Sequence, residues 1–292
     1  MELHQLRYLV AVADLGSFTA AAAHLHVSQS GVSAQIAKLE HEVGHRLLDR
    51  RGRTVSVTAA GHEVLPHARA ALASIATIAA VSDELSGVVR GSLRLGTVIG
   101  CTIPGYLAGF AAFRRTHPGV RISVVEGNSD LLIDDLATGR LDVALVTHTA
   151  PLPDAVTGLT VIREPLAVVV PRGHPWADRG AVTCAELVDV TVLSLPPGTG
   201  VRSALTSTCA AARVEVTPAV AAHSPDSVLA LVELGSGVGV LTAAMAAGRD
   251  TLAAIPVEDS VETSLSLAVS STPSAAARAL TTALTKELAT DR

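Results

Sequence analysis

The chain has 292 residues, of which 49% are hydrophobic and 17% are charged, and its formal net charge is −5 at pH 7. This hydrophobic content excludes a wholly disordered chain, and the length favours about two domains, one small and one larger. The negative net charge argues against a protein that coats polyanions over its whole surface.

Charge is distributed unevenly along the sequence. Residues 1–90 hold eight Lys or Arg, eight Asp or Glu and seven of the 11 His, whereas residues 91–292 hold 14 basic and 19 acidic residues. A local basic cluster within residues 38–53 consists of Lys38, Arg46, Arg50, Arg51 and Arg53. We interpret this cluster as a candidate contact for nucleic-acid phosphates, and an ordinary solvated face is the alternative.

Neither a membrane span nor a secretory signal is expected. The charge-free stretch 95–113 is interrupted by four glycines and Pro104, which favours a strand, a turn and a helix. The first ten residues lack a basic region and a cleavage site, so we expect a cytoplasmic protein without a membrane partner. Cys101, Cys184 and Cys209 are odd in number and lack CxxC spacing, which favours reduced thiols over a disulfide framework or a zinc site.

The first 44 residues predict three helices. A glycine, Gly16, ends the first, while Ser17 and Ser28 are suited to cap the second and third. The predicted apolar faces consist of Leu3, Leu6, Val10 and Ala13, then Phe18, Ala21, Ala22 and Leu25, then Val32, Ile36, Leu39 and Val43. Two short helices joined by a tight turn resemble a helix-turn-helix, whose second helix enters the major groove of DNA.

The outward face of the third helix is small and polar, so its backbone can approach DNA closely. Gln29 is suited to a bidentate contact with adenine, and nearby serines are suited to phosphate contacts at the helix N-terminus. The stretch 51–53 predicts a basic turn before the alternating strand 54–57, which resembles a wing. The candidate DNA-binding residues are Ser28, Gln29, Ser30, Ser33, Ala34, Lys38, Arg50, Arg51 and Arg53.

A long helix is predicted from the capping residue Thr58 to about Leu85. Its apolar residues alternate spacings of four and three, which is typical of a heptad seam that faces a partner helix. We expect dimerisation through Leu65, Leu72 and Ile75; the alternative is that the stripe packs on its own domain. Pro66 lies near the start of this helix, where we expect a kink rather than a break.

From residue 91 onwards the sequence alternates between strands and helices. Strands are predicted at 93–98, 120–127, 141–146, 166–171, 219–222, 238–241 and 264–269, and helices from 104, at 131–139, 201–212 and 225–234 and from 274. This pattern predicts two α/β lobes, with a late return of the chain to the first.

Residues 6–61, LRYLVAVADLGSFTAAAAHLHVSQSGVSAQIAKLEHEVGHRLLDRRGRTVSVTAAG, resemble the winged helix-turn-helix of LysR-type transcriptional regulators. The segments HPG at 117–119, GRLDVALV at 139–146 and PRGHPWA at 171–177 extend the resemblance, more loosely, over the chain. Ser30 stands where the family usually has proline, and Ala34 where a longer polar side chain is common. These departures affect direct base contacts more than the docking mode.

The resemblance implies a non-enzymatic regulator that binds an imperfect palindrome of double-stranded DNA as a homodimer or homotetramer. It implies an α/β fold (α+β overall), with a winged helix-turn-helix at 1–58 (motif about 18–37), a linker helix at 59–88 and an effector domain at 91–292. That domain looks like a solute-binding protein, with one lobe at about 91–162 and 268–292 and the other at about 163–267.

Ligands of open α/β lobes bind at the carboxyl ends of strands, next to helix N-termini. The polar residues at these positions suit a small polar or anionic metabolite, aided by Arg202 if it faces inward, although many of them could instead be helix caps. The candidate effector-binding residues are Thr97, Cys101, Thr102, Asn128, Thr147, His148, Thr199 and Ser224.

Three alternative functions follow from other features. The HEVGH segment, His41 to His45, matches the HExxH motif of zinc proteases, but Gly44 is expected to end the helix that this motif requires. Cys101 next to a helix N-terminus suggests a redox-sensing thiol, and its alternative is a small buried residue. The third is a solute-binding protein whose N-terminal helices only dimerise it. We expect no metal, since HExxH has no clear third ligand, and no dinucleotide cofactor, since the GSGVG segment at 235–239 follows a helix rather than a strand.

Overall fold

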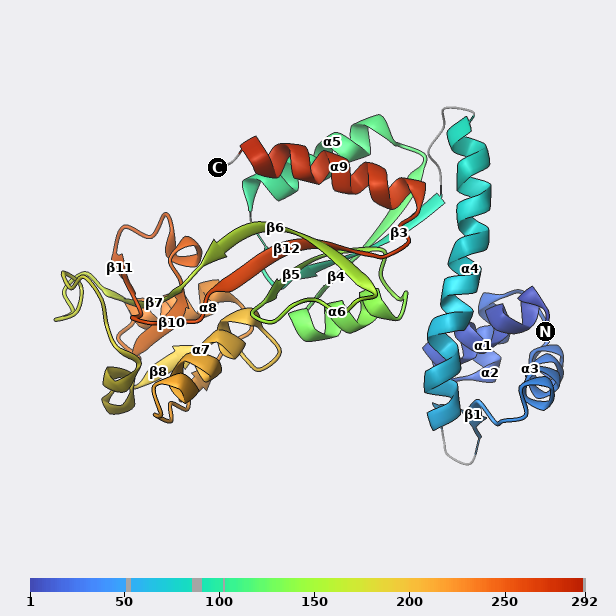
Figure 1. Ribbon diagram of the computed structural model, residues 1–292, viewed down its shortest axis with the longest axis horizontal. Helices are drawn as coiled ribbons and strands as arrows, with labels where there is room; N and C mark the ends of the chain where they lie inside the picture. The colour runs from blue at the N-terminus through green and yellow to red at the C-terminus, as the bar shows by residue number, and fades with distance from the viewer. Residues whose placement is uncertain (51–53, 86–90, 102, 291–292) are drawn as a thin grey trace. The chain divides into compact units, whose positions relative to one another are not determined.

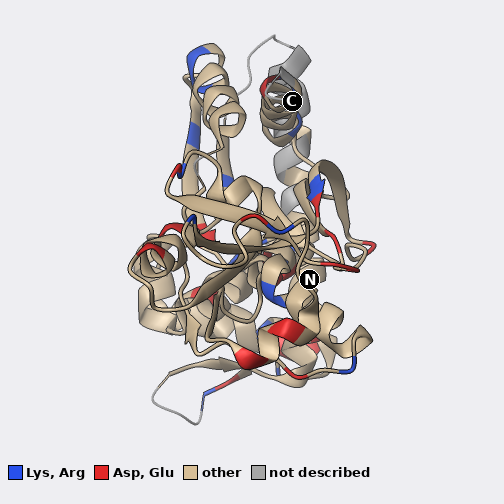
Figure 2. Ribbon diagram, turned by 90° about the vertical axis from the view of Figure 1, so that its left-hand side faces the viewer, with Lys and Arg blue, Asp and Glu red and all other residues tan. Residues whose placement is uncertain are grey.

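A computed structural model describes residues 1–50, 54–85, 91–101 and 103–290 (Figure 1). The chain forms two compact units, the first consisting of Met1–Arg90 with Ala137–Arg140 and the second of Gly91–Leu136 with Leu141–Arg292. Charged side chains are sparse, and most of the ribbon in Figure 2 carries neither sign. No helix in the described ranges is both long and apolar enough to cross a membrane.

Three helices and a short hairpin begin the first unit, as predicted. The αL conformation of Gly16 ends the first helix, and the Oγ atoms of Ser17 and Ser28 accept hydrogen bonds from Ala20 N and Gly31 N. The antiparallel hairpin lies on either side of residues 51–53, so the predicted basic turn lies outside the described residues. The elements are α1 (Leu3–Leu15), α2 (Phe18–His24), α3 (Gln29–Val43), β1 (Leu48–Asp49), β2 (Ser56–Val57) and α4 (Ala59–Leu85).

The core of the first unit contains most of the predicted apolar residues of α2 and α3, but the face predicted for α1 was largely wrong, because Leu9 and Val12 are buried whereas Leu3, Val10 and Ala13 are only half-buried. Leu9, Val12, Val32, Ile36 and Leu39 are fully buried together. The N-terminal part of α4 closes this core with Leu65 and Ala68, and Arg69 forms an ion pair with Asp14 of α1. Thr58 Oγ1 caps α4 by accepting a hydrogen bond from Gly61 N at 3.0 Å, as predicted.

The second unit contains two five-stranded sheets. The first sheet has the order β4-β3-β5-β12-β6, in which β3 is parallel to β4 and β5 while β12 is antiparallel to β5 and β6. Helices α5 and α9 lie side by side along it (Figure 1). Its elements are β3 (Gly91–Val98), α5 (Pro104–Thr116), β4 (Val120–Gly127), α6 (Ser129–Ala137), β5 (Val143–His148), β6 (Val156–Glu164), β12 (Thr263–Ser270) and α9 (Ala275–Thr290).

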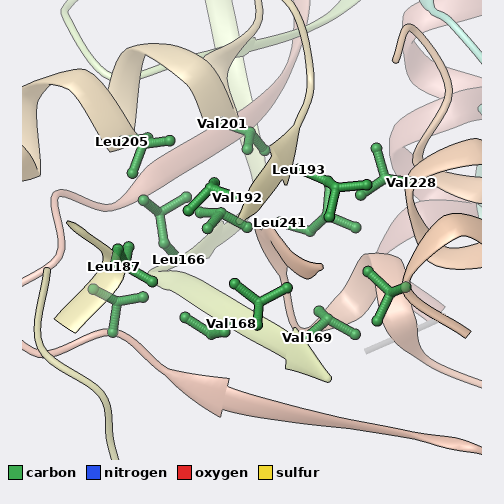
Figure 3. Close-up of a cluster of buried hydrophobic side chains, with 14 of the residues drawn as sticks. Leu166, Val168, Val169, Leu187, Val192, Leu193, Val201, Leu205, Val228 and Leu241 are labelled. Carbon is green, nitrogen blue, oxygen red and sulfur yellow. The ribbon is translucent and has the colours of Figure 1, made fainter. Parts of the chain in front are cut away.

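The second sheet has the order β11-β7-β10-β8-β9. Apolar side chains of this sheet and of the adjacent helices interdigitate in the core of Figure 3, where Val168, Leu193 and Val228 are fully buried. The elements are β7 (Leu166–Pro171), the 3₁₀ helix η1 (Cys184–Asp189), β8 (Val192–Ser194), α7 (Gly200–Ala211), β9 (Val220–Ala221), α8 (Pro225–Glu233), β10 (Val238–Thr242), the 3₁₀ helix η2 (Ala244–Ala246) and β11 (Leu252–Pro256).

The chain passes from the first sheet to the second between β6 and β7 and returns between β11 and β12. The predicted alternation of strands and helices is confirmed, and β6, β8 and β11 are additional strands that the sequence did not indicate. The sequence placed the return near residue 268, whereas all of β12, from Thr263, belongs to the first sheet.

One cysteine prediction was wrong. Cys184 of η1 and Cys209 of α7 form a disulfide, with their Cα atoms 5.8 Å apart, whereas the sequence favoured reduced thiols throughout. The two residues are separated by 25 positions, and only the packing of η1 against α7 brings them within bonding range. Cys101 is free and half-buried.

Candidate nucleic-acid interface and ligand cavity

Helix α3 has one buried and one exposed face. Val32, Ile36 and Leu39 are 0% exposed, so they fix the rotation of the helix about its axis. The opposite side is open to solvent and includes Gln29, Ser30, Ala34, Ala37 and Lys38, followed by the exposed His41 and Glu42 in the last turn. A surface of small side chains with one amide and one ammonium group can approach a nucleic-acid groove closely.

The serines at the start of α3 have structural partners. Ser28 Oγ accepts the hydrogen bond from Gly31 N at 3.1 Å and lies 3.4 Å from Ser30 Oγ. Ser28 is therefore the N-cap of the helix, and its remaining bonding capacity, together with that of Ser30, faces solvent. Gln29, the next residue, is exposed at the helix N-terminus.

Arg50 is held against α3 by several contacts. It donates to Ser33 Oγ at 3.0 Å and to Glu40 Oε2 at 3.4 Å, and its guanidinium lies 4.7 Å from the centre of the Phe18 ring. Glu40 Oε1 also accepts hydrogen bonds from the backbone N–H groups of Leu47 and Leu48, at 2.8 and 3.1 Å. Arg50 and Ser33 thus bond to one another, and this network fixes the chain after α3. Arg51 and Arg53 lie outside the described residues.

The HExxH segment does not form one helical turn. Helix α3 ends at Val43, Gly44 adopts the αL conformation, and His45 lies beyond the helix. The side chain of Glu42 pairs with the amino group of Met1. Within the described ranges, no group of three or more His, Cys, Asp or Glu residues has a geometry able to hold a metal ion.

The apolar seam of α4 changes character along the helix. Leu65 is 7% exposed within the core of its own unit, and Leu72 packs partly against that core. Ile75 and Ile78 are 40% and 70% exposed. Of the three residues predicted to dimerise the protein, Ile75 alone is an exposed apolar side chain, while Leu65 follows the alternative of packing on its own domain.

A cavity of about 260 Å³ lies in the second unit, at the carboxyl ends of strands from both sheets. Of the predicted effector-binding residues, Cys101, Asn128, Thr147 and Thr199 line it. Thr97, His148 and Ser224 are not among its lining residues, nor is Arg202, and Thr102 lies outside the described residues.

The two predicted threonines that line the cavity already have hydrogen-bond partners. Thr147 Oγ1 accepts from Gly200 N at 3.0 Å and bonds Ser129 Oγ at 2.9 Å. Thr199 Oγ1 donates to Pro196 O and caps α7 by accepting from Arg202 N. These groups join the loops around the cavity, as the capping alternative expected.

Two other predicted positions lie inside the first sheet or beside it. The ring of His148 bonds Ala150 O and Ser266 Oγ, at 2.7 and 2.8 Å. Thr97 is 5% exposed, and neither its Oγ1 nor the hydroxyl of Tyr106 has a hydrogen-bond partner among the described residues. Burial raises the pKa of Tyr106 to about 12.

The sequence did not single out several polar residues of the cavity wall, among them Glu164, Thr242, Arg249 and Thr263. Thr242 ends β10, so the rule that ligands bind at strand ends would have found it. Glu164 and Thr263 belong to the paired ends of β6 and β12, and β6 was not predicted. Arg249 follows η2, and no sequence signal marks it.

The exposed helix of the first unit and the two-lobed domain of the second define a class of protein: DNA-binding transcriptional regulators that carry an effector-binding domain. Two family models match the chain, "Bacterial regulatory helix-turn-helix protein, lysR family" over residues 3–62 and "LysR substrate binding domain" over residues 86–289. The chain therefore belongs to the LysR family of transcriptional regulators, and the resemblance found in the sequence is confirmed.

Several individual proteins are similar to this chain. The HTH-type transcriptional regulator YnfL of Escherichia coli (strain K12) is 35% identical over 83% of this chain and 82% of its own. A probable hydrogen peroxide-inducible genes activator of Mycobacterium avium is 33% identical over 87% of this chain and 79% of its own. The structure of a full-length OxyR variant from Pseudomonas aeruginosa covers 99% of this chain and 94% of its own, with a TM-score of 0.78 and 22% identity, which shows a shared fold.

Proposed function

We propose that this regulator reads an imperfect palindrome of double-stranded DNA as a homodimer or homotetramer, with the exposed face of α3 in the major groove. A small polar metabolite bound in the cavity of the second unit biases how the assembled subunits present their α3 helices. The protein acts in the cytoplasm, and by binding rather than by catalysis.

The observation that carries the proposal is the division of α3 into a fully buried and a fully exposed face. Because Val32, Ile36 and Leu39 anchor the helix, the exposed Gln29 and Lys38 have a defined direction. In this assignment Gln29 reads a base, while Lys38, Ser28 and Ser30 contact phosphates, and Ala34 allows close approach. Arg50 and Ser33 contact phosphate with the donors that their mutual hydrogen bond leaves unused, and Arg51 and Arg53 complete the phosphate contacts.

Footprinting on the DNA upstream of the protein's own gene tests this assignment, since regulators of this family often bind there. We expect protection of an imperfect palindrome. Gln29→Ala should relax specificity at one base pair of each half-site, at a cost of about 1–3 kcal/mol. Lys38→Ala should weaken binding to all DNA sequences alike. It should also lower the slope of log Kd against log salt concentration by about one unit per site.

Lys286→Ala in α9 is the control, because it removes the same charge from the second unit. Its salt dependence should equal that of the unmodified protein. Full retention of affinity, selectivity and salt slope in both Gln29→Ala and Lys38→Ala would remove α3 from the interface.

A further inference from the structure

The wall of the cavity contains a carboxylate without a balancing cation. Glu164 is half-buried at the end of β6, and its Oε2 accepts a hydrogen bond from Ala244 N at 3.2 Å. Among the described residues, Glu164 has no ion-pair partner. A carboxylate offers about four acceptor sites, so most of its bonding capacity is unused by the protein.

The other charges of the wall neutralise one another. Arg249 is the one Lys or Arg among the described lining residues, and it donates to Asp226 Oδ1 at 2.8 Å and to Glu233 Oε2 at 3.3 Å. Two carboxylates thus balance a single guanidinium. An anionic ligand, which the sequence allowed, would share the Arg249 guanidinium with these two carboxylates, and it would meet the Glu164 carboxylate as well.

A buried hydroxyl ends β10, the strand that leads to the residue bonded to Glu164. Thr242 is 2% exposed, lines the cavity and has no hydrogen-bond partner for its Oγ1 among the described residues. It precedes Ala244, the residue bonded to Glu164, by two positions. A buried hydroxyl without a partner is costly, and a ligand that donates a hydrogen bond would remove this cost.

The rest of the wall is largely apolar. Apolar side chains from β6 and β12 of the first sheet, from η2 and from the segments that follow β3 and β8 line the same cavity as Glu164 and Thr242, and they are Ile99, Ile103, Ile162, Leu195, Met245 and Leu265. A cavity of about 260 Å³ with this lining fits a compact molecule that has an apolar body and one polar head.

We propose that the cavity selects a small primary amine, with its ammonium group on Glu164 and Thr242 and its apolar body against the isoleucine and leucine side chains. An ammonium group has three donors and no acceptor, which matches a carboxylate and an unpartnered hydroxyl. This inference rests on the proposal that the cavity is the effector site, and it adds the charge of the effector.

Three probes with similar bodies and different heads test it: 2-phenylethylamine, 2-phenylethanol and 3-phenylpropionate. Binding of each to the full chain is measured by isothermal titration calorimetry at pH 7 and constant ionic strength. We expect the amine to bind at least about tenfold more tightly than the carboxylate, because its head forms a charge-assisted hydrogen bond. Glu164→Gln should abolish this preference. Thr242→Val should weaken binding of the amine and leave the affinity for the carboxylate unchanged.

Glu262→Gln is the matched control, since Glu262 lies near the start of β12 but not in the cavity wall, and it should keep the preference for the amine. Ala244→Trp blocks the cavity and should abolish amine binding. A tighter carboxylate, no amine binding at millimolar concentration, or an unchanged preference in Glu164→Gln would each overturn the inference. If the amine still binds to Ala244→Trp, the cavity is not the binding site. If Ala244→Trp abolishes binding but Glu164→Gln does not change it, the cavity remains the proposed effector site but does not select amines through Glu164.

Discussion

Replacing Glu40 tests the network that connects α3 to the hairpin. Its side chain is 11% exposed and accepts two backbone hydrogen bonds, from Leu47 N and Leu48 N, in addition to the contact from Arg50. Leu47 and Leu48 are 0% and 1% exposed, so water cannot readily replace the lost acceptor. Glu40→Ala therefore leaves two amide groups without this partner and Arg50 without its carboxylate.

The magnitude follows from these bonds. Each buried donor left unsatisfied costs about 1–3 kcal/mol, and the higher helix propensity of alanine returns a few tenths of a kcal/mol. We expect Glu40→Ala to lower the unfolding free energy of the first unit by about 2–5 kcal/mol. Glu40→Gln keeps an oxygen for the amides but loses the charge, so its cost should be about half as large. DNA affinity should fall in the same order, because the chain after α3 loses its anchor.

Two optical signals separate the units in this experiment. The single tryptophan, Trp176, belongs to the second unit, so its fluorescence during urea unfolding should not shift. Far-UV circular dichroism also follows the helices of the first unit, and this transition should move to lower urea. Glu42→Ala is the control on the same helix and should change stability by less than about 0.5 kcal/mol. A Glu40→Ala transition as stable as that of the control would refute the role of the network.

Four further predictions concern other parts of the chain. Gly61→Ala should destabilise the first unit by about 1–3 kcal/mol, although alanine favours helices. The reason is that an added Cβ would overlap the carbonyl oxygen of Leu47 and lie 2.7 Å from Val57 Cγ1. Urea unfolding measures this change, and a stabilised variant would contradict the close packing. Ser28→Ala should cost about 1 kcal/mol of thermal stability through the lost cap, whereas Ser28→Asp should keep the stability yet weaken DNA binding, and equal DNA affinity in both variants would place residue 28 away from phosphate. Cys184→Ser should lower the stability of the second unit by about 3.5 kcal/mol, the chain-entropy value for a cross-link over 25 positions, and a reductant should destabilise the unmodified protein equally but leave the variant unaffected. The hydrogen bond from Arg179 lowers the pKa of Glu186 from 4.5 to about 2. The contribution of the ionised Glu186 to folding stability is therefore complete above pH 4.5 and is lost as the pH falls toward 2. Glu186→Gln should flatten this part of the plot of stability against pH, and an unchanged plot would count against the pair.

Local rules were sufficient for the ends of the first three helices. The αL glycine after α1 and the serine caps of α2 and α3 act on backbone groups within three residues of themselves, so the sequence contains the whole interaction. The burial of one face of α3 follows from apolar spacing in the same local way. Leu65 shows the limit of this reasoning, because a heptad spacing does not distinguish a partner helix from the core of the same unit.

Interactions between distant segments were not accessible in this way. Strand β6 pairs with β12 across about 100 positions, and neither its exposed central residues nor its length sets it apart in the sequence. The disulfide between Cys184 and Cys209 depends on the packing of η1 against α7. The spacing of residues in the sequence predicts neither the pairing of β6 with β12 nor the approach of the two cysteines. The odd number of cysteines alone favoured free thiols.

The cavity shows why its position was easier to predict than its chemistry. Strand ends and helix starts must meet around a cleft in any such fold, and they supply Thr147 and Thr199. Their hydroxyls, however, are used to join the loops, as at Gly200 N and Arg202 N. Selectivity for a ligand must then come from groups that the fold itself does not use, and Glu164 and Thr242 meet that condition because one has no counterion and the other no hydrogen-bond partner among the described residues.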